Sequence, residues 1–591
     1  MKVIPLLVAA FGTVAAAKGG KDEGPAPSDI FDDKLARYSL LGGGCVLAFF
    51  LIWHAVLRFM GHIRHLTNLN NDTQRYFIPA HPFIAWFKKS IVYAPLFRKR
   101  HNREFKLSSA VNMGTLPTRF QTLLLVGIIA TNVTLCCITI PFPAPEKTVL
   151  GLIRNRSGTM ATVNLVPLVI MAGRNNPLIK LLGVSFDTWN LLHRWFARIV
   201  VLETLTHVLA WMINKVHNEG WEAVTTSFAG QFIQTGLIAT VAFVILAVHS
   251  PSAIRHAFYE TFLHIHIAMV AVSFGFLWVH LKKYPQRRFL LAAIVAWAVD
   301  RGLRFVLIAW RNFGSNGGTS ALVEVLPGEA MRITLRMARP WTFKPGQHLY
   351  LYIPAVGFWM SHPFTAAWSD SEELANGEKG LVTTQQDVSD SRKENISLIV
   401  RRRTGFTNKL YEKANERIGG RLSLNAFVEG PYGLEESLDS YGTVMLFAAG
   451  VGITHHVPYA RHLVEGYAAG TVAARRVTLV WIIQAPEHLE WIRPWMTTIL
   501  SMERRREVLR IMLFITRPRN TKEIHSPSAT VQMFPGKPNI QTLIDGEIEK
   551  QIGAMGVLVC GTGSLADDVR GACRKRQYSS SLDFVEESFT W

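Results

Sequence analysis

Seven apolar runs, each about as long as a bilayer crossing requires, constrain this 591-residue chain more than any other feature. They lie at residues 39–60, 120–142, 158–173, 192–213, 231–249, 262–281 and 288–310. Hydrocarbon offers no water to the backbone, so a run that crosses it has to bond its own N–H and C=O groups as a helix. The sequence therefore predicts a helical membrane domain of about seven spans.

The first residues predict the orientation of this domain. "MKVIPLLVAAFGTVAAA" combines a basic start, an apolar stretch and small residues, which is typical of a signal peptide at 1–17. Residues 18–38 are then an extracellular segment, and 39–119 hold the first span and a cytosolic loop. That loop carries the basic cluster "KKSIVYAPLFRKRHNREFK", in agreement with the positive-inside rule. Seven crossings leave everything after about residue 311 in the cytosol.

The formal charge of +20 is explained by the same arrangement, since much of the excess lies in short connectors between apolar runs. Nucleic acid is therefore not expected as a partner, whereas membrane lipid is. The sequon "NRS" at 155–157 falls outside the membrane in this topology and predicts a glycoprotein.

The second half of the chain changes character. Short alternating runs such as "MRITLRMA" and "HLYLYIPA" predict a β-barrel over residues 312–436. Over 437–591, strand-like runs such as "TVMLFAAG" and "GVLVCG" alternate with helical segments, which predicts a doubly wound parallel sheet.

Histidines are spaced unusually within two of the apolar runs. His193 and His207 are fourteen residues apart, as are His266 and His280. Fourteen residues turn a helix to within about 40° of four full turns and advance it about 21 Å, so each pair lies nearly on one face, with one histidine toward each side of the membrane. One span separates the two helices, so both cross in the same direction. The pairs His193–His266 and His207–His280 then predict two stacked bis-histidine haems.

The remaining membrane histidines do not share this spacing. His264 lies on nearly the opposite face from His280, and it is grouped with His54, His249 and His256 in packing or interfacial roles. Arg194 and Arg198, one turn apart, either pair with haem propionates or extend along the membrane interface.

Two strand ends in the cytosolic half predict nucleotide binding. "FAAGVGITHHVPY" places Gly450, Gly452 and Thr454 between a strand and a helix, where backbone N–H groups approach a pyrophosphate. "VLVCGTG" brings Cys560 to the same edge of the sheet, facing a nicotinamide ring or buried as a small thiol.

From about residue 115 to the C-terminus, the chain resembles fungal plasma-membrane ferric reductases, which are relatives of the NADPH oxidases. The resemblance rests on "AGRNNPL", "HRWFAR", "HPFT", "GVGITHHVPY", "LEWIRPW", "CGTGSLADDVR" and "EESFTW", in that order. It implies a ferric reductase-like transmembrane haem domain at 120–311, followed by a ferredoxin-reductase-like module of an FAD-binding barrel and an NADPH-binding α/β domain.

The resemblance also implies roles for individual residues. The four spaced histidines match the haem ligands of the family. The FAD site would consist of His362, Pro363, Phe364, Thr365, Gly405, Thr407, Phe589 and Trp591. The NADPH site would consist of Gly450, Gly452, Ile453, Thr454, Cys560 and Gly561. Gln484 stands where the family often has an arginine, which leaves the choice between NADPH and NADH open.

The implied function is a transmembrane metalloreductase that passes electrons from cytosolic NADPH through FAD and two b-type haems to extracellular ferric or cupric ions or chelates, siderophores included. It would support iron uptake, beside an iron permease and multicopper oxidase system, in the plasma membrane or a vacuolar membrane. A superoxide-generating NADPH oxidase would share every motif. A metal transporter or receptor would leave the flavin and nicotinamide motifs without a role.

Overall fold

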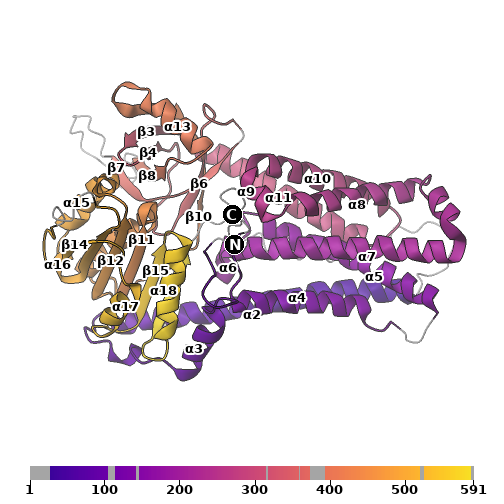
Figure 1. The fold of residues 1–591 in the computed structure, drawn as a ribbon, viewed down its shortest axis with the longest axis horizontal. Coiled ribbons are helices and arrows are strands. Elements are labelled where there is room, and N and C mark those ends of the chain that lie inside the picture. Colours follow the sequence, from indigo (N-terminus) through magenta and orange to yellow (C-terminus); the bar gives the residue numbers. More distant parts are fainter. Residues whose placement is uncertain are drawn as a thin grey trace, which may run out of the picture.

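The computed structural model describes residues 27–103, 114–140, 145–314, 317–358, 360–372, 393–518 and 525–587. A bundle of long helices extends from one side of a mixed α/β head (Figure 1). The long helices are α2 (Pro27–Asn68), α4 (Arg119–Cys137), α5 (Glu146–Ala172), α7 (Phe186–Ser227), α8 (Gln231–His249), α10 (Tyr259–His280) and α11 (Arg287–Asn312). Each overlaps one of the seven predicted apolar runs, in the predicted order, and α4 ends five residues before its run does.

Five of these helices are long and apolar enough to cross a membrane, namely α2, α4, α7, α8 and α10. The other two predicted spans lie in α5 and α11. Asp300, Arg301 and Arg304 interrupt the apolar run of α11, whereas the run of α5 has no charged residue but is short and includes Asn164 and Pro167. The first helix also begins earlier than the run at 39–60 predicts, at Pro27.

Ion pairs bring several helix ends together at the side of the bundle that lies away from the head. The Asp33 carboxylate pairs with Arg288 at the start of α11, and Asp32 lies 3.5 Å from Arg156 near the start of α5. The sequon that includes Arg156 is therefore part of helix α5 rather than of an external loop, and Ser157 is buried with its hydroxyl bonded to the Ile153 carbonyl. The structure does not offer this sequon as an exposed loop acceptor.

The barrel follows α11 and contains two antiparallel sheets. The five-stranded sheet has the order β7 (Trp368–Glu372), β8 (Lys393–Arg401), β4 (Ala330–Arg336), β3 (Ser320–Leu326) and β9 (Arg421–Asn425). The three-stranded sheet has the order β10 (Phe427–Tyr432), β5 (His348–Tyr352) and β6 (His362–Thr365). Alternate apolar side chains from both sheets and from α13 (Phe406–Asn415) form one core, as the period-two pattern predicts.

The C-terminal domain is a parallel six-stranded sheet. Its order is β14 (Val531–Pro535), β13 (Leu509–Ile515), β12 (Arg476–Ile483), β11 (Thr443–Ala449), β15 (Met555–Cys560) and β16 (Leu582–Glu587). Its helices include α14 (Ile453–Ala469), α15 (Arg493–Ser501), α17 (Ile540–Ile548) and α18 (Gly563–Lys575). The chain leaves β11 toward β12 on one side and returns to β15 on the other. The carboxyl edge between β11 and β15 is thus the switch point where doubly wound sheets bind ligands.

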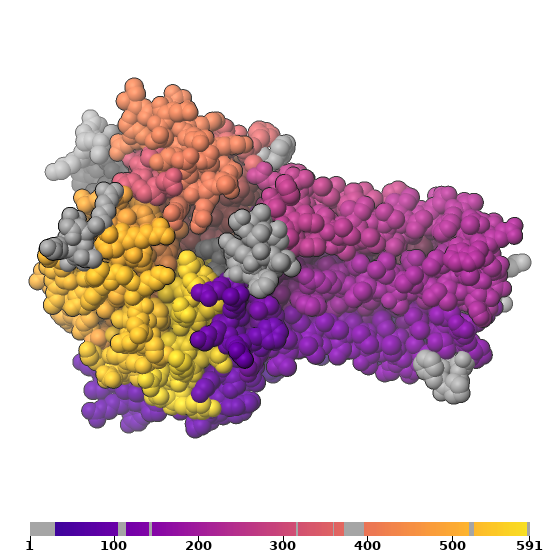
Figure 2. Space-filling view, in the orientation of Figure 1, coloured from indigo at the N-terminus to yellow at the C-terminus, as the bar shows by residue number. Residues whose placement is uncertain are grey.

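The loop between α2 and α4 packs on the C-terminal domain, so it lies on the same side as the head (Figure 2). The Asp567 carboxylate accepts backbone N–H bonds from His101, Asn102 and Arg103 at 3.0–3.2 Å. Lys88 pairs with Asp583 at 2.5 Å. The loop and the head therefore lie on the same side of the helix bundle.

Candidate functional site

The four predicted histidines lie at two levels of the helix bundle. His193 and His266 face each other from α7 and α10, with ring centroids 6.4 Å apart. His207 and His280 lie fourteen residues further along the same two helices, so they mark a second level about 21 Å away. The structure thus brings His193 and His266 together, as the spacing argument requires for the first pair.

Three of these histidines use the same ring nitrogen for a hydrogen bond. Nδ1 of His193 donates to the Leu168 carbonyl at 2.9 Å, and Nδ1 of His207 donates to the Arg154 carbonyl at 2.7 Å. Nδ1 of His280 donates to the Phe232 carbonyl at 2.9 Å. A proton held at Nδ1 leaves the Nε2 lone pair available to a metal, and such an outer hydrogen bond fixes the ring orientation of metal-ligating histidines.

Two glycines allow these rings to approach neighbouring helices. A Cβ at Gly158 of α5 would lie 2.5 Å from Nδ1 of His207, and a Cβ at Gly236 of α8 would lie 2.7 Å from Cε1 of His280. Real Cβ contacts do not become that short. Any larger residue at either position would push the ring away from the carbonyl that orients it.

Three arginines gather near the end of α7 that holds His193. Arg194 and Arg198 come from α7, and Arg255 comes from the short helix α9 (Ser252–Ala257). They are close enough for electrostatic repulsion, and Nε of Arg255 is buried without a hydrogen-bond partner among the described residues. A carboxylate of a bound cofactor could accept a hydrogen bond from this buried donor. Arg198 also lies 4.6 Å from the centre of the Trp195 ring.

The predicted flavin motif forms strand β6 of the barrel, which includes Pro363, Phe364 and Thr365. The His362 ring stacks on Phe406 at 4.4 Å, and its Nε2 is buried with no hydrogen-bond partner in the part of the chain that the structure describes. Burial lowers the pKa of His362, and the Glu260 carboxylate of α10 acts in the opposite direction. This strand therefore lies beside the first turn of the helix that carries His266.

Gly405 and Thr407 flank Phe406 at the start of α13. Gly405 has φ +74°, a left-handed conformation that favours glycine, and the Thr407 hydroxyl accepts the Arg403 N–H at 2.9 Å. Both predicted residues thus form the turn that positions Phe406 against His362.

A buried ionic cluster joins the barrel to the helix bundle. The Glu429 carboxylate is 1% exposed. It accepts Arg304 Nε at 3.0 Å, the Tyr352 hydroxyl at 2.8 Å and the Tyr432 hydroxyl at 2.7 Å. Arg174, from the loop after α5, lies 3.8 Å from the same carboxylate. These bonds fix the barrel relative to α11 and the loop.

The glycine turn that is predicted to bind the nucleotide follows β11. Gly450 has φ +55°, and its carbonyl accepts the indole N–H of Trp481 at 3.0 Å. Ile453 is fully buried in the domain core, and the Thr454 hydroxyl donates to the Val451 carbonyl at 2.8 Å. The backbone of the turn, rather than these two side chains, is therefore what faces the edge of the sheet.

The second predicted strand end meets the first at close range. A Cβ at Gly452 would lie 2.2 Å from the Cys560 carbonyl oxygen, and a Cβ at Gly561 would lie 2.7 Å from Cβ of Ala449. Cys560 is buried, and burial raises the pKa of its thiol. The parallel register places Cys560 beside Glu587. Thr562, the next residue but one, caps helix α18 with its hydroxyl.

Phe589 and Trp591 lie outside the described residues. The structure does bring Glu587, just before them, beside Cys560 at the carboxyl edge of the sheet, which sequence reasoning missed. Burial, together with the nearby carboxylates of Asp187, Glu436 and Glu586, raises the pKa of Glu587 to about 8. The alternation of apolar and polar residues along the last strand could have indicated which face of the sheet Glu587 lies on. It could not have indicated which side chains surround it.

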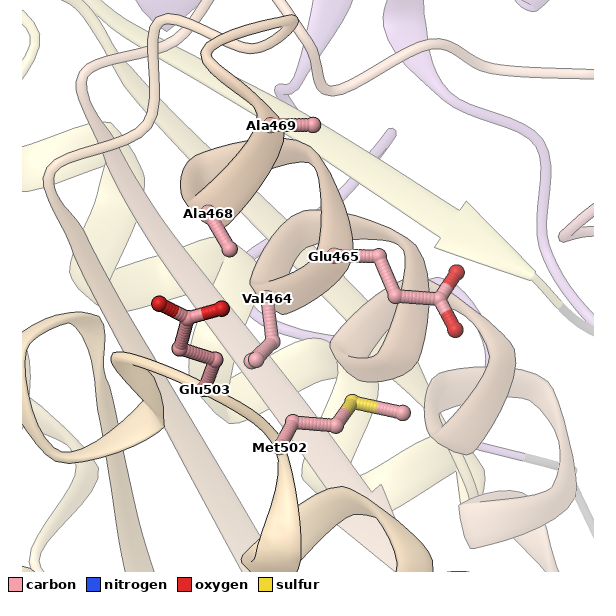
Figure 3. Close-up of a pocket in the computed structure, with 6 residues that line it drawn as sticks. All are labelled: Val464, Glu465, Ala468, Ala469, Met502 and Glu503. Atoms are coloured by element: carbon pink, nitrogen blue, oxygen red, sulfur yellow. The ribbon is translucent and has the colours of Figure 1, made fainter.

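A surface hollow on the C-terminal domain is separate from this edge (Figure 3). It lies at the far end of α14 from the glycine turn, and two carboxylates near it disfavour a phosphate group. Its lining consists of Val464, Glu465, Ala468, Ala469, Met502 and Glu503.

Comparison with known protein families identifies three domains in the order of this fold. The ferric reductase like transmembrane component matches residues 157–277, an FAD-binding domain matches 315–378, and the ferric reductase NAD binding domain matches 441–574. The first covers His193, His207 and His266, the second covers β6, and the third covers both glycine turns.

Among curated proteins, the chain is similar to "Ferric/cupric reductase transmembrane component 2" of Saccharomyces cerevisiae, with 25% identity over 93% of this chain and 77% of the relative. It is 24% identical to "Ferric/cupric reductase transmembrane component 1" of Candida albicans, over 85% of this chain and 67% of the relative. "Probable cell surface ferric reductase kap2" of Aspergillus oryzae is 25% identical over 57% of this chain and 44% of its own length. The chain thus combines a ferric reductase-like transmembrane component with an FAD-binding domain and a ferric reductase NAD-binding domain, which is the domain set of a transmembrane ferric or cupric reductase.

Proposed function

We propose that this protein reduces extracytosolic ferric or cupric ions or their chelates with electrons from cytosolic NADPH. One observation carries the proposal. The barrel strand β6 lies beside the cytosolic end of α10, and α7 and α10 continue from there across the bundle with one histidine each at two levels. The four histidines are thereby aligned from the head to the far side of the bundle.

The residues present fit the groups that such a path needs. His193 and His266 would hold one haem and His207 and His280 the other, each through Nε2, because Nδ1 is engaged in three of the four. The unpaired Arg255 Nε would meet a propionate of the first haem, beside Arg194 and Arg198. Bound FAD would supply the conversion of a hydride into single electrons, and haems at the two histidine pairs would supply one-electron sites.

The chain's own groups place the two flavin partners. His362 and Phe406 offer a stacked pair and an unpaired ring nitrogen to the flavin from strand β6 and helix α13. The Gly450–Gly452 turn presents backbone N–H groups to the pyrophosphate of NADPH. Cys560 and Gly561 border the nicotinamide and exclude water there, since Cys560 is buried. Phe589 and Trp591 are proposed to cover the flavin.

The substrate and the membrane are inferred from the relatives. Two of them are named ferric/cupric reductases and one a cell surface ferric reductase. We therefore place this protein in the plasma membrane, where it would reduce ferric or cupric chelates, siderophores included, and supply an iron permease and multicopper oxidase system. A superoxide-producing oxidase is the alternative, and the relatives' names do not favour it.

The spectrum of the purified protein tests the haem assignment. We expect two b-type haems per chain, both reduced by dithionite. His207→Leu should lose one of them, whereas His264→Leu should lose none, because His264 is exposed and bonds only to the Glu260 carbonyl of its own helix. A wild-type protein without haem, or a His207→Leu protein that keeps both, would refute the assignment.

The substrate is tested in sealed proteoliposomes supplied with NADPH on the side of the head and a ferric chelate on the other. We expect the rate of ferrous ion formation to be the same with and without superoxide dismutase. If dismutase abolished ferric reduction, the electrons would leave as superoxide and the protein would be an oxidase.

A further inference from the structure

His249 ends helix α8 and has no role in the path described above, yet it lies beside one of the proposed iron ligands. Its ring centroid is 5.8 Å from that of His266. Phe262 packs against both rings, at 5.2 Å from His249 and 5.4 Å from His266. His193, His249 and His266 therefore lie close together at one level of the bundle, although a haem there would need only two histidine ligands.

The hydrogen bonds of His249 fix its tautomer. Nδ1 lies 2.6 Å from the Ile245 carbonyl, one turn back on the same helix, so Nδ1 carries the proton. Nε2 then has a lone pair and no proton. This atom is buried and has no hydrogen-bond partner among the described residues. His249 is thus a buried acceptor without a donor.

His266 has the complementary deficit. The other three proposed ligands each donate Nδ1–H to a backbone carbonyl, whereas Nδ1 of His266 is buried with no partner in the described part of the chain. If Nε2 of His266 binds iron, Nδ1 must carry the proton. A buried donor on His266 and a buried acceptor on His249, both unpaired, then lie on adjacent rings.

We propose that His249 is a positioning residue for the haem nearest the head, with its Nε2 accepting the Nδ1–H of His266. The structure holds the two rings next to each other without this bond. Iron at Nε2 of His266 would fix the proton at Nδ1 and draw the two nitrogens together. The bond would orient His266 and raise its basicity, as outer-shell partners of metal-ligating histidines do. The inference rests on the proposed function, because it needs haem at His193 and His266.

The experiment compares three variants of the full-length protein in detergent or nanodiscs. His249→Leu removes the acceptor, His249→Gln replaces it with an amide oxygen, and His264→Leu is the matched control on α10. The readouts are haem per chain, the midpoint potential of each haem by spectroelectrochemical titration, and the low-spin ferric EPR signals. His193→Leu identifies which of the two signals belongs to the haem nearest the head.

We expect His249→Leu to keep two haems per chain and to shift the midpoint potential of that one haem upward, because a less basic ligand stabilises ferric iron less. His249→Gln should return the potential toward the wild-type value, and His264→Leu should leave it unchanged. The potential of the haem at His207 and His280 should stay constant in all three variants.

Two results would overturn the inference about His249 and leave the proposed function intact. One is a His249→Leu protein with two haems and unshifted potentials. The other is a His249→Leu protein that retains one haem, because His249 would then be an iron ligand rather than a partner of His266. A wild-type protein without b-type haem would instead overturn the proposed function, and this inference with it.

Discussion

Substitution of Gly452 by alanine tests whether the edge between β11 and β15 is the nicotinamide site. The new Cβ would lie 2.2 Å from the Cys560 carbonyl oxygen, whereas ordinary contact begins at 3.4 Å. The two strand ends would therefore have to separate by about 1.2 Å. The atom in the way is backbone in the centre of a parallel sheet, so no flexible side chain can yield. Such overpacking costs about 1–3 kcal/mol of stability.

The displacement should matter more for catalysis than for folding. Misplacement of reacting groups by about 1 Å lowers rates about 100-fold. We therefore expect kcat/KM for NADPH to fall about 100-fold in Gly452→Ala, measured anaerobically as reduction of the bound flavin. Flavin content, haem content and reduction of ferric chelate by the dithionite-reduced protein should remain at wild-type levels, because the barrel and the bundle are untouched.

Gly571→Ala is the matched control. Gly571 lies in α18 of the same domain, and a Cβ there meets no atom within 4 Å. This variant should behave as the wild type does. If Gly452→Ala also reduced its flavin at the wild-type rate, the close approach of the two strand ends would not define the nicotinamide site, and the reasoning would be refuted.

Three further predictions concern single side chains of the cytosolic half. Glu429→Gln should destabilise the protein by about 3–5 kcal/mol, because Arg304 loses its buried partner. The loss is measured as a lower midpoint temperature of flavin release. A second substitution that removes Arg304 should restore part of the lost stability. Gln484→Arg should raise the NADPH-to-NADH ratio of kcat/KM roughly tenfold through a charge-assisted bond to the 2′-phosphate, and an unchanged ratio would remove Gln484 from that site. The pKa of Glu587 is raised to about 8, so the stability tied to its neutral form is complete below about pH 4.5 and is lost as pH rises through 8. Glu587→Gln should match the wild-type melting temperature at pH 5 and exceed it at pH 9, and equal melting temperatures at both would contradict the raised pKa.

Local periodicity made much of the membrane half predictable from sequence. The number and order of the long helices follow from apolar runs, and the pair His193 and His266 follows from a fourteen-residue spacing that depends only on helix geometry. The same spacing argument did not select His249, because α8 is antiparallel to α7 and α10. The position of a residue along α8 therefore cannot be aligned with theirs from the sequence. Contacts between antiparallel helices depend on tilt and packing, which a spacing within one helix does not contain.

The cytosolic half was predictable at its glycine turns and much less at its carboxylates. A left-handed residue such as Gly450 is set by local backbone sterics, so the sequence signals it. Glu587 and Asp567 acquire their roles from residues several hundred positions away, such as Asp187 and the backbone around Asn102. No local pattern distinguishes these carboxylates from solvated ones.

The junction between barrel and bundle explains why three separate motifs belong together. Arg174 of "AGRNNPL" lies 3.7 Å from the centre of the Tyr350 ring, which belongs to "KPGQHLYLYIP". The side-chain amide of the neighbouring Asn175 lies 3.0 Å from the hydroxyl oxygen of Tyr432, from "GPYG", whose proton is donated to Glu429. All three segments converge on the Glu429 carboxylate. Since electron transfer from a cytosolic flavin to a membrane haem depends on the distance between them, a rigid junction at this point is a condition for the proposed path. The motifs thus specify where the barrel is held as much as what it binds.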